Sequence, residues 1–196
     1  MKLPAILAVG LLALAIAAPA SATIIVYDAA LNGAAEAPPN ASAGIGATII
    51  TIDTVASTMR VQILFAGLSG LTTASHIHCC TASANTGTAG VATELPTFTG
   101  FPLGVSNGTY DRTFDMSLAA TFNPAFLSAR GGNVATAFSD FIAGLTDGKA
   151  YLNIHSSVYP GGEIRGFLHA VPEPATLSVI GLGLAGIGFA RRRKAA

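Results

Sequence analysis

A run in which every second side chain is large and apolar is the feature that most constrains the fold of this chain. In residues 59–65 these side chains alternate with Arg60, Gln62 and Leu64. A period of two is typical of a β-strand that buries one face and exposes the other. A second segment, rich in isoleucine and threonine, covers residues 44–53, and a polar turn over residues 54–58 joins the two. The sequence therefore predicts a β-hairpin.

Other segments have the β-branched and aromatic composition of strands and are separated by turns rich in Gly, Asn and Pro. These segments are residues 23–31, 75–79, 109–118, 150–156 and 162–170. One helix is expected to begin at Asn133, a favourable N-cap, and to end at Gly144, and residues 124–129 add a helical turn. The sequence thus predicts a mainly β fold, an antiparallel β-sandwich or Greek-key barrel with one or two short helices.

The first 22 residues have the parts of a secretory signal peptide. Lys2 precedes an apolar run, and Ala20, Ser21 and Ala22 supply the small residues that a signal peptidase requires. The apolar run is shorter than the ~20 residues that span a bilayer, so a retained membrane helix is the less favoured alternative. We expect signal peptidase to cut after Ala22 and the rest of the chain to be exported.

The last 26 residues, 171–196, also combine three parts in a fixed order. Prolines keep the first part extended, an apolar stretch over residues 175–190 follows, and cations that do not cross a bilayer cheaply come last. The extended part is Pro172, Glu173 and Pro174, and the cations are Arg191, Arg192, Arg193 and Lys194. The apolar stretch predicts a single membrane helix, which is short and rich in glycine, as suits a temporary anchor.

This order of triplet, apolar stretch and basic cluster resembles the PEP-CTERM sorting signal of Gram-negative bacteria, which an exosortase reads. The resemblance implies a protein that contacts the inner membrane transiently, is processed after the triplet and ends at the cell surface or outside the cell. An ordinary C-terminal membrane anchor is the alternative interpretation. The tail predicts a location and gives no chemistry for the remaining residues.

Between the two end segments, residues 23–170 form one domain of ordinary size. The whole chain has 10 basic and 10 acidic residues, but this part holds only five basic residues against nine acidic ones, a net charge of −4. Nucleic-acid binding requires a basic face that neutralises phosphates, so the charge argues against a nucleic-acid partner.

Three segments in this domain resemble the CHRD domain, first described in chordin and present as single copies in bacteria. They are L-N-G-A-A-E-A-P-P at residues 31–39, L-S-G-L-T-T-A-S-H-I-H at 68–78, and G-K-A-Y-L-N-I-H at 148–155 with P-G-G-E-I-R-G at 160–166. The likeness covers residues 25–169 and departs at Cys79 and Cys80 and over residues 96–146. It implies a β-sandwich-like extracellular module and no particular activity.

The histidines of these segments are candidate metal ligands. Alternate residues of a strand share a face, so His76 and His78 project together, and His155 shares a face with Tyr151 and Asn153. If the two strands are neighbours, His76, His78 and His155 can converge on a Zn or Cu ion. The alternative is that each histidine hydrogen-bonds a loop carbonyl or a carboxylate, with Glu36 or Glu163 as the acidic partner.

The two cysteines of the chain, Cys79 and Cys80, are adjacent. Export to an oxidising compartment disfavours free thiols. Three interpretations stay open: a vicinal disulfide after the H-I-H segment, thiolates that join His76 and His78 on a soft metal, and intermolecular disulfides in a surface matrix.

No catalytic motif stands out in the sequence. G-x-S-x-G, Walker and dinucleotide patterns are absent, and Glu163 and Arg165 are expected to form exposed cross-strand ion pairs. The sequence therefore predicts a non-enzymatic component of the cell surface or of an exopolysaccharide matrix, with surface polysaccharide or matrix proteins as partners and no cofactor. The alternative prediction is a metal-binding or redox protein with a Cu or Zn site on the histidines.

Overall fold

A computed structural model gives the structure of residues 24–172. The predicted signal peptide, Glu173, Pro174, the predicted membrane span and the basic cluster lie outside these residues. Among the helices of residues 24–172, none is long and apolar enough to cross a membrane.

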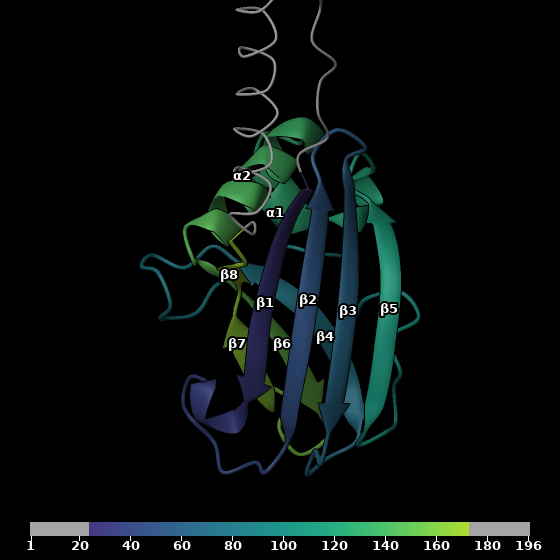
Figure 1. Cartoon of the computed structure of the whole chain (residues 1–196), viewed down its shortest axis with the longest axis vertical. Coiled ribbons are helices and arrows are strands. Elements are labelled where there is room, and N and C mark those ends of the chain that lie inside the picture. The colour runs from purple at the N-terminus through teal and green to yellow at the C-terminus, as the bar shows by residue number, and fades with distance from the viewer. Residues whose placement is uncertain (1–23, 173–196) are drawn as a thin grey trace, which may run out of the picture.

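The described chain forms a curled antiparallel sheet with helices at one end (Figure 1). The strands are β1 (Ile24–Asn32), β2 (Ile45–Asp53), β3 (Thr58–Ala66), β4 (Thr72–Cys79), β5 (Gly108–Asp115), β6 (Ala150–Ser156), β7 (Ile164–Phe167) and β8 (His169–Ala170). The helices are α1 (Pro124–Ser128) and α2 (Val134–Thr146), with short 3₁₀ turns η1 (Gly33–Ala35) and η2 (Ala119–Thr121). The strand order is β4-β6-β7-β1-β2-β3-β5, and β8 pairs with β1. The predicted mainly β, antiparallel fold is therefore confirmed.

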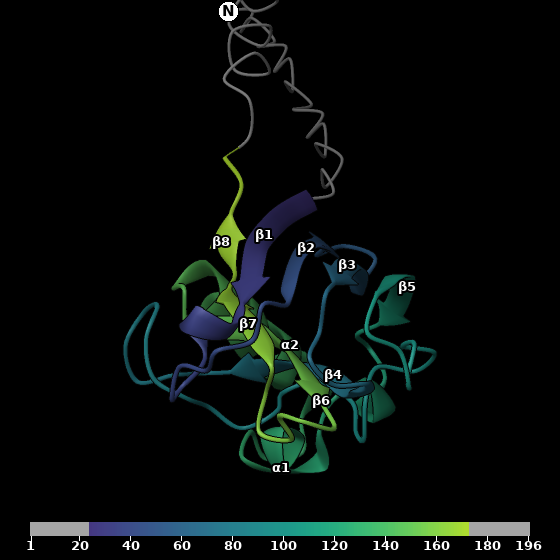
Figure 2. The ribbon, with the colours of Figure 1, turned by 90° about the horizontal axis from the view of Figure 1, so that it is seen from below.

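The two layers of the predicted sandwich are halves of this one sheet. β1 joins β7 at a single register position, Asn32 opposite Arg165, and the sheet bends there. Figure 2 shows the half made of β1, β2, β3 and β5 crossing over the half made of β7, β6 and β4. Gly166 permits the close approach, because a Cβ at this position would overlap the carbonyl oxygen of Ala30 in β1.

The core lies between the two halves. The alternating residues of β3, from Met59 to Phe65, are at most 4% exposed, and Ile77, Leu152 and Ile154 of the other half are fully buried. Each such side chain contributes roughly 1.5–3 kcal/mol by leaving water. The period of two that predicted the hairpin is thus the pattern that fills the core.

Helix α2 closes the core at one end with Phe138, Phe141 and Leu145. Asn133 caps it as predicted, because its side chain accepts a hydrogen bond from the Thr136 N–H. The prediction that Gly144 ends the helix is wrong. The helix continues to Thr146, and Gly148, with a φ of +66°, supplies the left-handed residue that follows the C-cap.

Glu163 is buried and organises the loop between β3 and β4. Its carboxylate accepts hydrogen bonds from the Ser42 hydroxyl, at 2.6 Å, and from the N–H groups of Ser69 and Gly70. The prediction of exposed cross-strand ion pairs for Glu163 and Arg165 is wrong, because both side chains are buried. The Glu163 side chain lies among backbone donors, and Arg165 pairs with Glu36 instead.

We expect acid to remove the stabilisation that Glu163 provides. Burial raises its pKa, but hydrogen bonds from Ser156, Ser42, Ser69 and Gly70 outweigh burial, so the pKa lies below its ordinary value of 4.5. The folded state therefore binds fewer protons than the unfolded state, and stability is lost as the pH falls through the folded-state pKa. E163Q should lower the free energy of unfolding by about 1–3 kcal/mol at neutral pH. It should also make the free energy of unfolding fall less steeply as the pH decreases, which urea titrations at several pH values measure.

The exposed strand residue Asp28 provides the control, because D28N removes a carboxylate that the fold does not bury. If the free energy of unfolding falls equally steeply with decreasing pH in E163Q and D28N, the role given to Glu163 is contradicted.

Candidate metal centre

Strands β4 and β6 place three histidines on one face. In their antiparallel register His76 lies opposite Asn153, His78 opposite Tyr151 and Ala74 opposite His155. The inward-facing residues between them, such as Ile77 and Ile154, belong to the core, so the histidines lie on the outer face of this half of the sheet. The strand pairing on which the predicted convergence depended is present.

The three imidazole rings form a compact triangle. Ring centroids are 5.9 Å apart for His76 and His78, 5.3 Å for His76 and His155, and 5.9 Å for His78 and His155. One ring nitrogen from each lies within 4.8 Å of the other two. The triangle therefore has the composition and approximate size of a three-histidine metal site, and a modest inward movement would give each nitrogen a metal distance of about 2.0–2.1 Å.

Backbone carbonyls fix the orientation of all three rings. His76 Nε2 lies 2.6 Å from the Pro96 oxygen, His78 Nδ1 lies 2.9 Å from the Ala89 oxygen, and His155 Nδ1 lies 2.9 Å from the Pro160 oxygen. A carbonyl can only accept, so each of these ring nitrogens donates its proton. In the neutral ring the other nitrogen then carries a lone pair, which is the arrangement that outer carbonyls impose on metal-ligating histidines.

The remaining ring nitrogens are the candidate ligand atoms. His76 Nδ1, His78 Nε2 and His155 Nε2 are buried and have no hydrogen-bond partner. A buried acceptor without a partner costs about 1–3 kcal/mol, so a ligand that satisfies these nitrogens would stabilise the fold. A shared metal ion would satisfy all three at once.

Burial keeps these rings neutral. It lowers the pKa of His78 to about 4 and also lowers the pKa values of His76 and His155 below 6.5. The bond to Ala89 and the neighbouring His155 act on His78 in opposite directions and are secondary to burial. Protons therefore do not compete for the free lone pairs at neutral pH.

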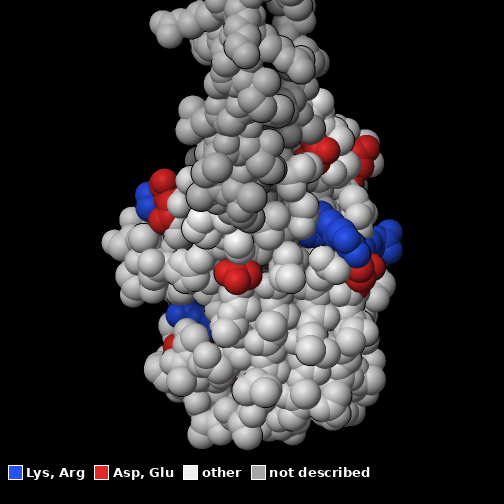
Figure 3. All heavy atoms as spheres, viewed as in Figure 1, with Lys and Arg blue, Asp and Glu red and all other residues white. Residues whose placement is uncertain are grey.

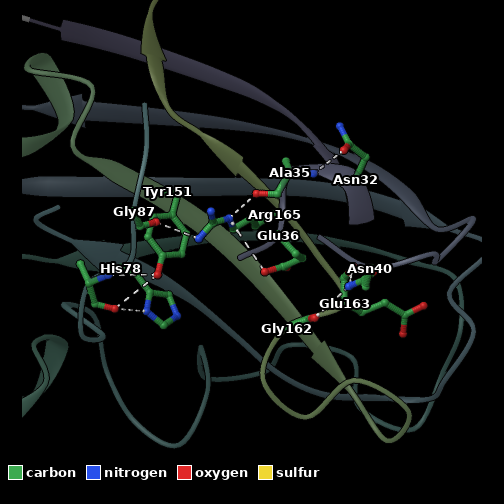
Figure 4. Close-up of polar contacts among 11 residues, drawn as sticks. Asn32, Ala35, Glu36, Asn40, His78, Gly87, Tyr151, Gly162, Glu163 and Arg165 are labelled. Atoms are coloured by element: carbon green, nitrogen blue, oxygen red, sulfur yellow. Dashed lines mark hydrogen bonds and ion pairs between the residues drawn. The ribbon is translucent and has the colours of Figure 1, made fainter. Parts of the chain in front are cut away.

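The ring of His78 stacks on Tyr151, and Arg165 lies against Tyr151 in turn (Figure 4). The centroids of the His78 and Tyr151 rings are 4.8 Å apart, and their planes lie within 6° of each other. The Tyr151 hydroxyl donates to the same Ala89 oxygen that His78 uses. On the other side, the Arg165 guanidinium lies 4.7 Å from the Tyr151 ring centroid. Tyr151 was predicted to lie on the histidine face. Arg165 was not, although Arg165 and Phe167, two residues apart in β7, share one face of the strand.

Glu36 does not contact the histidines. Its carboxylate lies 3.9 Å from Arg165 Nε, and both side chains are buried. Burial raises the pKa of Glu36 to about 7, and the charge of Arg165 acts in the opposite direction. The expectation that Glu36 or Glu163 is the acidic partner of a histidine is therefore wrong. Loop carbonyls have that role because β4 and β6 face the loops, while both glutamates turn toward other donors.

Cys79 and Cys80 are joined by a disulfide in this structure. Cys79 belongs to the hydrophobic core, and a Cβ at Gly144 of α2 would overlap both sulfur atoms. The sulfurs thus contact the helix, whereas His78 points to the opposite face of β4. With this geometry the thiolates are not available to the ring nitrogens.

The described residues define a class, a curled antiparallel β-sheet domain, and the sequence predicts a sorting tail after it. Comparison with family models gives a match to the CHRD domain over residues 27–168 and to the PEP-CTERM protein-sorting motif over residues 170–194. The chain belongs to the CHRD domain family, and its motif marks it as an exported protein that an exosortase sorts to the cell surface. No curated protein and no solved structure matches the chain.

Proposed function

We propose that the protein is a non-enzymatic cell-surface module whose CHRD domain binds one copper or zinc ion through His76, His78 and His155. Two observations carry the proposal: each of the three histidines has a buried ring nitrogen without a hydrogen-bond partner, and one ring nitrogen of each lies within 4.8 Å of the other two. Imidazole is a ligand that copper and zinc both favour.

The surroundings of the cluster support binding more than catalysis. Each ring is braced by a carbonyl from a different place in the loops, at Ala89, Pro96 and Pro160, so the ligands are oriented before an ion arrives. None of the three histidines is freely exposed. A preorganised and enclosed site suits a domain that holds or carries an ion outside the cell.

The test is the metal content of the full chain, purified in detergent and dialysed after loading with Cu or Zn. We expect about one ion per chain, with H78Q reducing the content at least ~10-fold because a three-ligand site loses one ligand. His169 supplies the matched control, since it is exposed and belongs to β8, so H169Q should keep full content. Less than about a tenth of an ion per wild-type chain would sink the proposal.

A second candidate function is attachment to an exopolysaccharide matrix. In Figure 3 the lower part of the face made of β2, β3 and β5 is free of charged side chains, while charged side chains gather in the middle of the face and near β5. This face holds an open hollow of about 450 Å³ in which apolar side chains alternate with hydroxyl, amide and carboxylate groups. The hollow is lined by Ala47, Thr48, Ile49, Gln62, Ile63, Leu64, Thr109, Tyr110 and Asp111. Such a surface suits a neutral sugar chain.

Co-sedimentation with the host's purified exopolysaccharide tests this second candidate. L64D places a charge on an exposed side chain of the hollow and should abolish co-sedimentation, while L118D, at an exposed leucine away from it, should not. Binding that is equal in the two variants would exclude the hollow.

A further inference from the structure

The donor set of the histidine cluster carries no negative charge. Among the residues that the structure describes, His76, His78 and His155 form the one group of three or more histidine, cysteine and acidic side chains able to share an ion. An imidazole binds a metal ion as the neutral ring. Carboxylate and thiolate ligands, which offset the charge of a divalent ion elsewhere, are missing from this group. An ion bound here keeps its full charge.

A positive charge lies one aromatic ring away from the cluster. Figure 4 shows Tyr151 between His78 and Arg165, with Glu36 beyond the guanidinium. The ring of Tyr151 is 4.8 Å from that of His78 and 4.7 Å from the Arg165 carbon Cζ, measured to the ring centroids. Arg165 is 4% exposed, so water screens its charge poorly. The arginine therefore repels a cation in the cluster, and repels a divalent cation twice as strongly, while Glu36 on the far side of the guanidinium offsets part of this repulsion.

Burial of the site also disfavours a divalent ion relative to a monovalent one. The free nitrogens of all three histidines are buried, so an ion among them loses most of its hydration. The cost of moving an ion into a medium of low dielectric constant rises with the square of its charge, which makes a divalent ion about four times as costly as a monovalent one. Three nitrogen ligands also suit a zinc ion that keeps a water as its fourth ligand, so the preference against Zn(II) rests on charge and burial.

We infer that the cluster selects the monovalent copper ion, Cu(I), in three-coordinate form over Zn(II) and Cu(II). This inference rests on the proposed function and names its ion. Imidazole nitrogen is an accepted ligand of copper, and Cu(I) is the copper state with the lower charge. Cys79 and Cys80 take no part, because their sulfurs are bonded to each other on the core side of β4.

Competition against chromophoric chelators tests the selectivity of the full chain in detergent. Cu(I) is measured without oxygen, and Zn(II) and Cu(II) are measured in parallel at the same pH. We expect Cu(I) to bind at one per chain and at least ~100-fold more tightly than Zn(II). Tighter or equal binding of Zn(II) or Cu(II) at one per chain would overturn the inference and leave the proposed function standing. Absence of binding for all three ions would overturn both.

A charge-neutral double variant tests the part given to Arg165. R165Q alone would leave the buried Glu36 without its ion-pair partner, so R165Q is combined with E36Q. Far-UV circular dichroism then checks that the double variant is folded. We expect Zn(II) affinity to rise at least ~5-fold relative to Cu(I) affinity, because the repulsion of the doubly charged ion falls more. An unchanged ratio in a folded double variant would contradict the electrostatic account, and E36Q alone, which keeps the arginine, should not raise the ratio.

Discussion

The metal-loaded chain is expected to unfold about 8–16 °C above the metal-free chain. An ion that binds only the folded state stabilises it by RT ln(1 + [L]/Kd), which is about 4 kcal/mol when the free ion is 1,000-fold above Kd. For a domain of this size each 1 kcal/mol raises Tm by about 2–4 °C. The ligands come from β4 and β6, which the whole sheet must hold in register, so the effect should reach the global unfolding transition. Differential scanning calorimetry of the full chain in detergent measures it.

The histidine variants separate this effect from metal binding elsewhere. H78Q should remove the thermal shift, and H169Q should retain it because His169 lies outside the cluster. Metal-free H78Q should be about as stable as the metal-free wild type or slightly more stable, since one buried nitrogen without a partner is gone. A shift of equal size in H78Q would place the ion at another position.

Replacement of Gly166 by alanine is expected to destabilise the domain by about 3 kcal/mol or more, at the upper end of overpacking costs. The new Cβ would overlap the carbonyl oxygen and carbon of Ala30, and neither atom can rotate away because both are backbone atoms of β1. The strand would have to leave the bend where Asn32 meets Arg165. Chemical denaturation of the purified variant gives the free-energy difference.

Gly161 offers the matched control for this substitution. It lies in the β6–β7 connection, five residues from Gly166, and a Cβ there meets nothing within 4 Å. G161A should change stability by no more than about 0.5 kcal/mol. Equal stability of G166A and G161A would show that β1 and β7 can separate at low cost, contrary to the structure.

The sequence predicted the strands well because their signal is local. The alternation in β3 needs no knowledge of its neighbours, and the Asn133 cap is readable from a single side chain at a helix start. Gly144 was misassigned because a glycine can serve two purposes. Here it makes room for two sulfur atoms under α2, and the conformational role expected of it belongs to Gly148.

The candidate site was predictable only as a possibility. The H-I-H spacing puts His76 and His78 on one face, but the arrival of His155 depends on the register of two strands about 75 residues apart in the chain, which no local pattern encodes. The sequence allowed loop carbonyls as partners but could not identify which ones, since Ala89 and Pro96 belong to an irregular connection and accept through their backbone oxygens. Arg165 was assigned to the surface because arginines usually lie there. Its burial depends on Tyr151, Phe167 and Glu36, which the fold brings together.

The short strand β8 places the first residues of the matched sorting segment, Ala170 and Val171, against β1. Ala170 pairs with Tyr27, and the N–H of Val171 donates to the Val26 oxygen at 2.8 Å. Pro172, the first residue of the triplet, follows directly, at most about 7 Å of extended chain beyond Ala170. An exosortase that processes the motif therefore meets a folded body within one or two residues of its recognition sequence. Separation of the exposed residues His169 and Ala170 from β1 would lengthen the free chain before the triplet. The stability of the β1–β8 pairing therefore affects how closely the processing enzyme can approach the triplet.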